Sequence, residues 1–84
     1  MITRKMVVQL SGGLEARPVA MLVQVASQYQ SKIYFEADDK KINAKSIMGV
    51  MGLGLTAGEE IMVSADGDDA ENALNGIQEY LSGK

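Results

Sequence analysis

Two of the side chains that enzymes use most often in catalysis are absent from this sequence. It has no cysteine and no histidine, which excludes disulfides, thiolate metal sites, the commonest general base and the commonest zinc ligand. The residues with reactive or phosphate-binding groups that draw attention are Glu15, Arg17 and Ser46. We therefore expect no catalytic residue, no metal site and no cofactor.

Ser46 stands immediately before a short apolar segment that favours a helix. Serine is a preferred N-cap, because its hydroxyl oxygen accepts a backbone N–H, and it stabilises a helix by about 1 kcal/mol relative to alanine. A phosphate at the same place would meet unpaired N–H groups and the positive end of the helix dipole. Ser46 can thus be a structural cap and a phosphorylation site at once.

The segment that follows this serine holds more large apolar residues than a two-turn helix can bury. The spacing predicts that Val50 and Leu53 face the core, whereas Ile47, Met48 and Met51 face solvent. Flexible, polarisable methionines suit an adaptable docking surface. We therefore expect an exposed apolar patch next to the serine.

The strands that position these residues are indicated by alternating apolar side chains. They are expected over residues 2–10, 32–37, 40–44 and 60–66. Asp38-Asp39 forms the turn of a hairpin, and Ala57-Gly58 turns the chain before the last strand.

The helices are indicated by apolar stripes at intervals of three and four residues. Pro18 suits the first turn of the first helix, whose buried stripe is Val19, Leu22, Val23 and Ala26. The second helix opens at Ser46 and frays near Gly52 or Gly54. Asp68 or Asp69 caps the third helix, and Gly83 ends it; its buried stripe is Ala70, Ala73, Leu74, Ile77 and Leu81.

The resulting order, β-α-β-β-α-β-α, predicts an α+β fold. We expect an open-faced two-layer sandwich, in which a four-stranded antiparallel sheet carries three helices on one face. The length of 84 residues allows one domain.

Charge and composition exclude several classes of partner. The net charge of −3, with three tyrosines, one phenylalanine and no tryptophan, disfavours nucleic-acid binding. The apolar run over residues 6–10 is too short for a signal peptide or a membrane span. We expect a cytoplasmic protein that does not bind membranes.

Two segments resemble a known family. Residues 13–18 read Gly-Leu-Glu-Ala-Arg-Pro, similar to the active-site motif Gly-aliphatic-His-Ala-Arg-Pro of HPr, the small phosphocarrier of the bacterial sugar phosphotransferase system. Residues 45–51, Lys-Ser-Ile-Met-Gly-Val-Met, resemble the regulatory serine segment of that family. Length, motif separation and element order are similar too, so the resemblance implies one HPr-like domain over residues 1–84.

One position departs from the HPr pattern. The HPr histidine carries a phosphoryl group from enzyme I to sugar-specific proteins, and here the matching residue is Glu15. The chain is thus similar to the histidine-less, catabolite-repression HPr-like (Crh-like) branch. That resemblance implies phosphorylation of Ser46 by the bifunctional HPr kinase/phosphorylase. It also implies that the phosphorylated form acts, without touching DNA, as corepressor of catabolite control protein A, a LacI-type transcription factor, in carbon catabolite repression.

The resemblance also implies a partner-binding surface. It consists of Arg17 and Ala20 on the first helix and the apolar patch of the second, Ile47, Met48 and Met51. Met21 or Val25 would extend it. Arg17 has a donor fork suited to phosphate, but a solvated arginine in a first helical turn is an equal alternative.

Glu15 has three interpretations. It could accept phosphate as an acyl phosphate, imitate phosphohistidine by its charge, or simply interact favourably with the helix dipole and with Arg17. We favour the last, because it needs no partner. Two other functions stay open: a phosphocarrier that uses Glu15, and an allosteric partner of a metabolic enzyme that acts independently of Ser46. We expect a monomer or a strand-exchanged dimer, in which Gly12-Gly13 would serve as the hinge.

Overall fold

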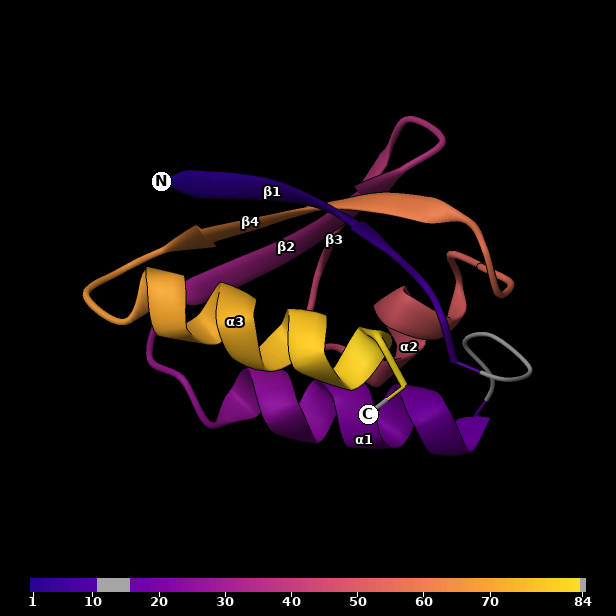
Figure 1. Cartoon of the computed structure of the whole chain (residues 1–84), viewed down its shortest axis with the longest axis horizontal. Helices are drawn as coiled ribbons and strands as arrows, with labels where there is room; N and C mark the ends of the chain where they lie inside the picture. Colours follow the sequence, from indigo (N-terminus) through magenta and orange to yellow (C-terminus); the bar gives the residue numbers. More distant parts are fainter. Residues whose placement is uncertain (11–15, 84) are drawn as a thin grey trace.

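The computed structural model describes residues 1–10 and 16–83. The elements follow the predicted order and are β1 (Ile2–Val7), α1 (Ala16–Ser27), β2 (Lys32–Ala37), β3 (Lys40–Asn43), α2 (Ile47–Met51), β4 (Glu60–Asp66) and α3 (Ala70–Leu81). Figure 1 shows the strands as one layer and the helices as a second layer on one side of it. The predicted α+β two-layer sandwich is confirmed.

The sheet has the strand order β1-β4-β2-β3, and all neighbouring strands are antiparallel. Its register places Met6 opposite Ile61, and Phe35 opposite Val63. These side chains are buried between the sheet and the helices. On the helix layer, α3 packs on β1 and β4, α2 packs on β3, and α1 contacts both other helices.

The apolar stripes predicted for α1 and α3 form the other half of this core. All of their members are buried, namely Val19, Leu22, Val23, Ala26, Ala70, Ala73, Leu74, Ile77 and Leu81. The predicted hairpin turn is also present: Asp38 and Asp39 have φ of 52° and 65°, as a two-residue type I′ turn requires.

Two of the strands are shorter than predicted. β1 ends at Val7 rather than at residue 10, because Val8 N donates to Glu59 O (2.9 Å) and Gln9 N donates to Leu81 O (2.8 Å) outside the ladder. α1 ends at Ser27, where the bonding pattern changes to i→i−3. β3 ends at Asn43, one residue earlier than predicted.

Asp69 is at the N-cap position of α3, but its side chain does not cap that helix. The carboxylate instead accepts hydrogen bonds from Gln30 N (2.8 Å), from Ser31 N (2.9 Å) and from the Ser31 hydroxyl. The hydrogen bond from Ser31 is the main reason why the pKa of Asp69 lies below its ordinary value. The prediction of a capping carboxylate was therefore right in position and wrong in partner. Asp69 ties α3 to the segment that enters β2.

Within the described residues, every helix is too short, or too polar, to cross a bilayer.

Candidate functional site

Ser46 occupies the N-cap of α2, as predicted. Its backbone is extended (φ −107°, ψ 113°), and its Oγ accepts a hydrogen bond from Gly49 N at 3.2 Å. Its carbonyl oxygen accepts from Val50 N at 3.0 Å. Because the residue is only partly buried, the hydroxyl lies within reach of the surface.

Three further hydrogen bonds fix the chain directly before α2. Ser46 N donates to Asn43 O (3.0 Å), and Lys45 N donates to the side-chain Oδ1 of Asn43 (2.8 Å). Lys45 Nζ reaches across to Tyr29 O at 2.7 Å, just beyond the carboxyl end of α1, where a cation is favourable. The ammonium group next to Ser46 is thus held by the backbone after α1. No local residue pattern predicted this long-range contact.

Gly49 allows this tight corner to form. A Cβ at Gly49 would lie 3.3 Å from Ser46 Oγ and 3.4 Å from Ile42 Cβ, closer than most side chains permit. A glycine inside a helix costs about 1 kcal/mol relative to alanine. Here the lack of a side chain at Gly49 lets α2 pack closely against the Ser46 cap and against β3, which offsets that cost.

The two faces of α2 are divided as predicted. Val50 is fully buried and Leu53 packs partly buried against the core. Met48 is 82% exposed, Ile47 47% and Met51 43%. The exposed apolar face of α2 is thus confirmed.

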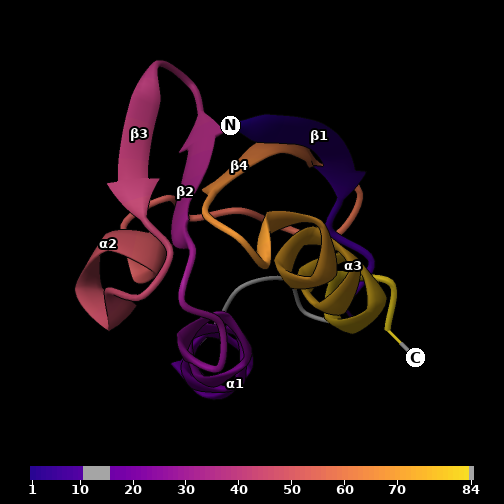
Figure 2. The same cartoon turned by 90° about the vertical axis from the view of Figure 1, so that its left-hand side faces the viewer.

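The first helix adds to this surface. Arg17, Ala20 and Met21 are exposed on α1, which packs against α2 (Figure 2). Val25 is half-buried against the core, so of the two residues expected to extend the patch, Met21 is the exposed one. We call Arg17, Ala20, Met21, Ile47, Met48 and Met51 the docking surface, and their role in binding a partner is proposed below. Glu15 lies outside the described residues.

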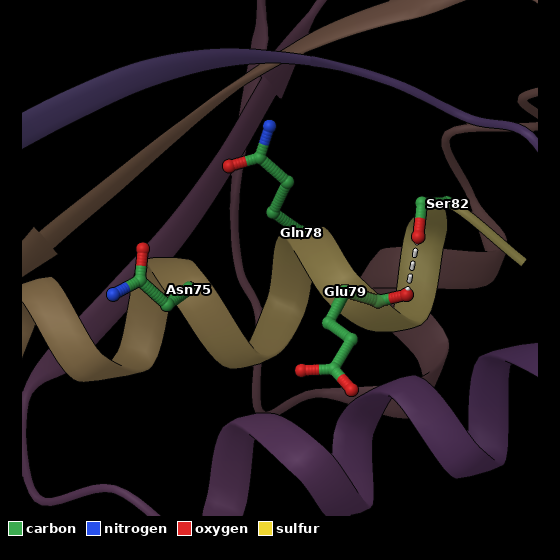
Figure 3. Close-up of a pocket in the computed structure, with 4 residues that line it drawn as sticks. All are labelled: Asn75, Gln78, Glu79 and Ser82. Carbon is green, nitrogen blue, oxygen red and sulfur yellow. Dashed lines mark hydrogen bonds between the residues drawn. The ribbon is translucent and has the colours of Figure 1, made fainter. Parts of the chain in front are cut away.

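A second feature, which the sequence did not single out, lies on α3. A shallow hollow of about 470 Å³ is lined by Asn75, Gln78, Glu79 and Ser82, as Figure 3 shows. Arg4 Nη1 on β1 donates to Asn75 Oδ1 (2.9 Å) and to Gln78 Oε1 (2.7 Å). None of the lining residues belongs to α1 or α2. The i, i+3, i+4, i+7 spacing of polar residues could have indicated a shared helix face, but not the arginine that approaches it.

Carboxylates do not gather into a metal centre in the part of the chain that is described: residues 1–10 and 16–83 hold no group of three or more suitable ligands.

Comparison with known proteins places this arrangement in a family. Residues 2–82 match the family described as the PTS HPr component phosphorylation site. The HPr-like protein Crh of Bacillus subtilis (strain 168) is 43% identical over 81 residues, which are 96% of this chain and 95% of that protein.

Solved structures agree with the sequence relatives. A crystal structure of a phosphocarrier protein HPr from Bacillus anthracis str. Ames superposes with a TM-score of 0.92 at 41% identity, covering 95% of each chain. A crystal structure of Bacillus subtilis Crh, a domain-swapped dimer, has a TM-score of 0.79 at 42% identity, covering 99% of this chain and 95% of that one. Family match, relatives and fold together show that the chain belongs to the HPr family, in its Crh-like branch.

Proposed function

We propose that this protein is a non-catalytic regulator whose state is set by phosphorylation of Ser46. HPr kinase/phosphorylase adds and removes the phosphate, and the phosphorylated form acts as corepressor of catabolite control protein A in carbon catabolite repression. The observation that carries this proposal is the position of Ser46 Oγ, at the start of α2 and directly before the exposed Ile47 and Met48. Membership of the Crh-like branch supports the choice of kinase and transcription factor.

The fold can tolerate a phosphate on Ser46. The unmodified hydroxyl already accepts a hydrogen bond from Gly49 N, and a phosphate brings three acceptor oxygens to the same position. Ser46 is partly exposed, so the added charge of about −1.5 to −2 is not forced into the core. Phosphorylation should therefore change recognition rather than folding.

Recognition would combine the new charge with the apolar surface beside it. Lys45, the nearest lysine in the sequence, donates to Tyr29 O in the unmodified protein. While that hydrogen bond persists, Lys45 does not pair with the phosphate, and a cationic side chain of the partner can bind the phosphate instead. A partner that offers a basic residue next to an apolar pocket for Met48 would gain affinity, and Arg17 would contribute from α1.

Glu15 does not relay phosphate in this proposal. With no histidine in the sequence, the only acceptor at that position is a carboxylate, a weaker nucleophile than a neutral imidazole nitrogen. In this proposal the negative charge of Glu15 only interacts favourably with the positive end of the α1 helix dipole.

Two labelling reactions test the proposal. HPr kinase/phosphorylase with labelled ATP should label the wild type and not Ser46→Ala. Enzyme I with labelled phosphoenolpyruvate should leave the protein unlabelled. Hydroxylamine-sensitive label at Glu15 would contradict the proposal and support a phosphocarrier.

We also propose that the chain exists as a monomer or as a strand-exchanged dimer. β1 pairs with β4 over the whole length of the strand, from Ile2 opposite Ala65 to Val7 opposite Glu60. The same antiparallel pairs can form between two copies, as an exchange of an identical element requires. Light scattering after size-exclusion chromatography should give a mass of one or two chains; a larger mass would refute this pairing as the basis of assembly.

A further inference from the structure

The methionines of this chain differ widely in exposure. Met6 is 2% exposed in the core and Met62 is half-buried on β4, whereas the exposed fractions of the others are 43% for Met51, 48% for Met21, 70% for Met1 and 82% for Met48. The susceptibility of a thioether to oxidation follows its exposure. Met48 is therefore the methionine that a dissolved oxidant reaches most easily.

A change in the polarity of the Met48 side chain would alter the docking surface without disturbing the fold. Met48 is the second residue of α2, two positions after Ser46 and two before Val50. Val50 is fully buried and anchors α2 to the core, while Met48 projects from it. A change confined to the Met48 sulfur alters the docking surface and leaves the anchor of the helix intact.

We propose that Met48 is a site of reversible oxidation by peroxides, and that its sulfoxide closes the docking surface. The thioether sulfur attacks one oxygen of the peroxide, the O–O bond breaks, and an S–O bond forms. The sulfur is oxidised by two electrons, and hydrogen peroxide is reduced to water. Methionine sulfoxide reductase reverses the step with two electrons from thiols.

The expected effect follows from the polarity of the sulfoxide. Its oxygen is a hydrogen-bond acceptor, and burying it in an apolar pocket without a donor is unfavourable. A partner that buries the Met48 side chain would thus bind the oxidised protein more weakly, whether or not Ser46 carries phosphate. This second half of the inference rests on the proposed function, whereas the order of oxidation does not.

The first experiment maps the oxidation. The folded protein is treated with hydrogen peroxide, and sulfoxides are quantified by peptide mass spectrometry over time. Met48 should be oxidised at least as fast as Met1, which lies at the opposite end of the molecule (Figure 1), and on the order of tenfold faster than Met6. The melting temperature should stay unchanged while Met48 alone is oxidised. Oxidation of Met48 no faster than that of Met6, or unfolding that accompanies it, would overturn the proposal.

The second experiment measures docking through the rate at which HPr kinase/phosphorylase phosphorylates Ser46. Peroxide should lower this rate at least about threefold in the wild type, and sulfoxide reductase should restore it. Met48→Leu cannot form a sulfoxide at position 48 and keeps an apolar side chain there, so after the same treatment it should retain most of the rate that it shows without peroxide. Equal losses in the wild type and in Met48→Leu would refute a role for Met48.

The two experiments separate this inference from the proposed function. If the kinase does not phosphorylate the untreated wild-type protein, the proposed function is refuted, and so is the part of the inference that concerns docking. The sulfoxide map would still decide whether Met48 is the modification site.

Discussion

Replacing Met48 with aspartate should weaken partner binding and leave the fold almost unchanged. Met48 is 82% exposed, so less than a fifth of its surface is buried. Full burial of a methionine stabilises a fold by about 1.5–3 kcal/mol, so the replacement of Met48 should lose only about 0.3–0.5 kcal/mol of burial free energy. For a domain of this size that corresponds to a drop in melting temperature of at most about 4 °C.

Val50→Ala is the matched control for stability. Val50 is fully buried two residues further along the same helix, and its two methyl groups are worth about 2–3 kcal/mol including the cavity that their removal leaves. Its melting temperature should fall by about 10–20 °C. The difference between the falls in melting temperature of the two variants shows which face of α2 packs in the core.

The assays are calorimetric melting and binding to HPr kinase/phosphorylase. Met48→Asp should lose at least about tenfold in affinity, or about 1.4 kcal/mol. Asn72→Asp adds the same charge at an exposed position on α3 and should bind like the wild type. A fall in melting temperature of more than about 10 °C in Met48→Asp, or unchanged affinity, would refute the assignment of the exposed face.

Three further variants test other positions of the chain. Asp69→Asn should remove stability that is present above the ordinary carboxyl pKa of 3.8 and is lost as the pH falls through the lower pKa of the folded state; the gap in urea midpoint between variant and wild type should be large near neutral pH and shrink as the pH falls below 3.8, and a constant gap would contradict this. Gly67→Ala would place a Cβ 2.5 Å from Ser31 Oγ and should lower the melting temperature more than Gly54→Ala, whose Cβ would meet nothing within 4 Å; the reverse order in thermal scans would refute the close approach. Glu15→His should gain label from enzyme I and labelled phosphoenolpyruvate, and no gain would mean that more than the histidine separates this chain from HPr carriers.

Local patterns predicted the parts of the fold that depend on neighbouring residues. The burial of Val50 and the exposure of Met48 follow from helical spacing and from the number of apolar residues in one short segment. Ser46 was predicted as a cap because serine before an apolar helix is a local signal. The Asp38-Asp39 turn is local in the same way.

Contacts between distant parts of the chain could not be predicted. The Asp69 carboxylate binds Ser31, 38 residues earlier, and a capping role is the local alternative that sequence alone favours. The Lys45 ammonium reaches Tyr29 O, and Arg4 reaches Gln78 across 74 positions. Each contact depends on how the helices are laid on the sheet, which periodicity does not specify.

In the proposed function, phosphate on Ser46 turns the docking surface into a binding site for catabolite control protein A. The most direct test is calorimetric binding of that transcription factor to the wild type, to the phosphoserine form and to Ser46→Ala. Ser46→Ala loses a cap worth about 1 kcal/mol, so its melting temperature must show that it is folded at the assay temperature. The phosphoserine form should bind at least about tenfold more tightly than the other two, which should bind alike. Equal affinities for all three would contradict a phosphoserine switch and leave Ser46 as a helix cap alone.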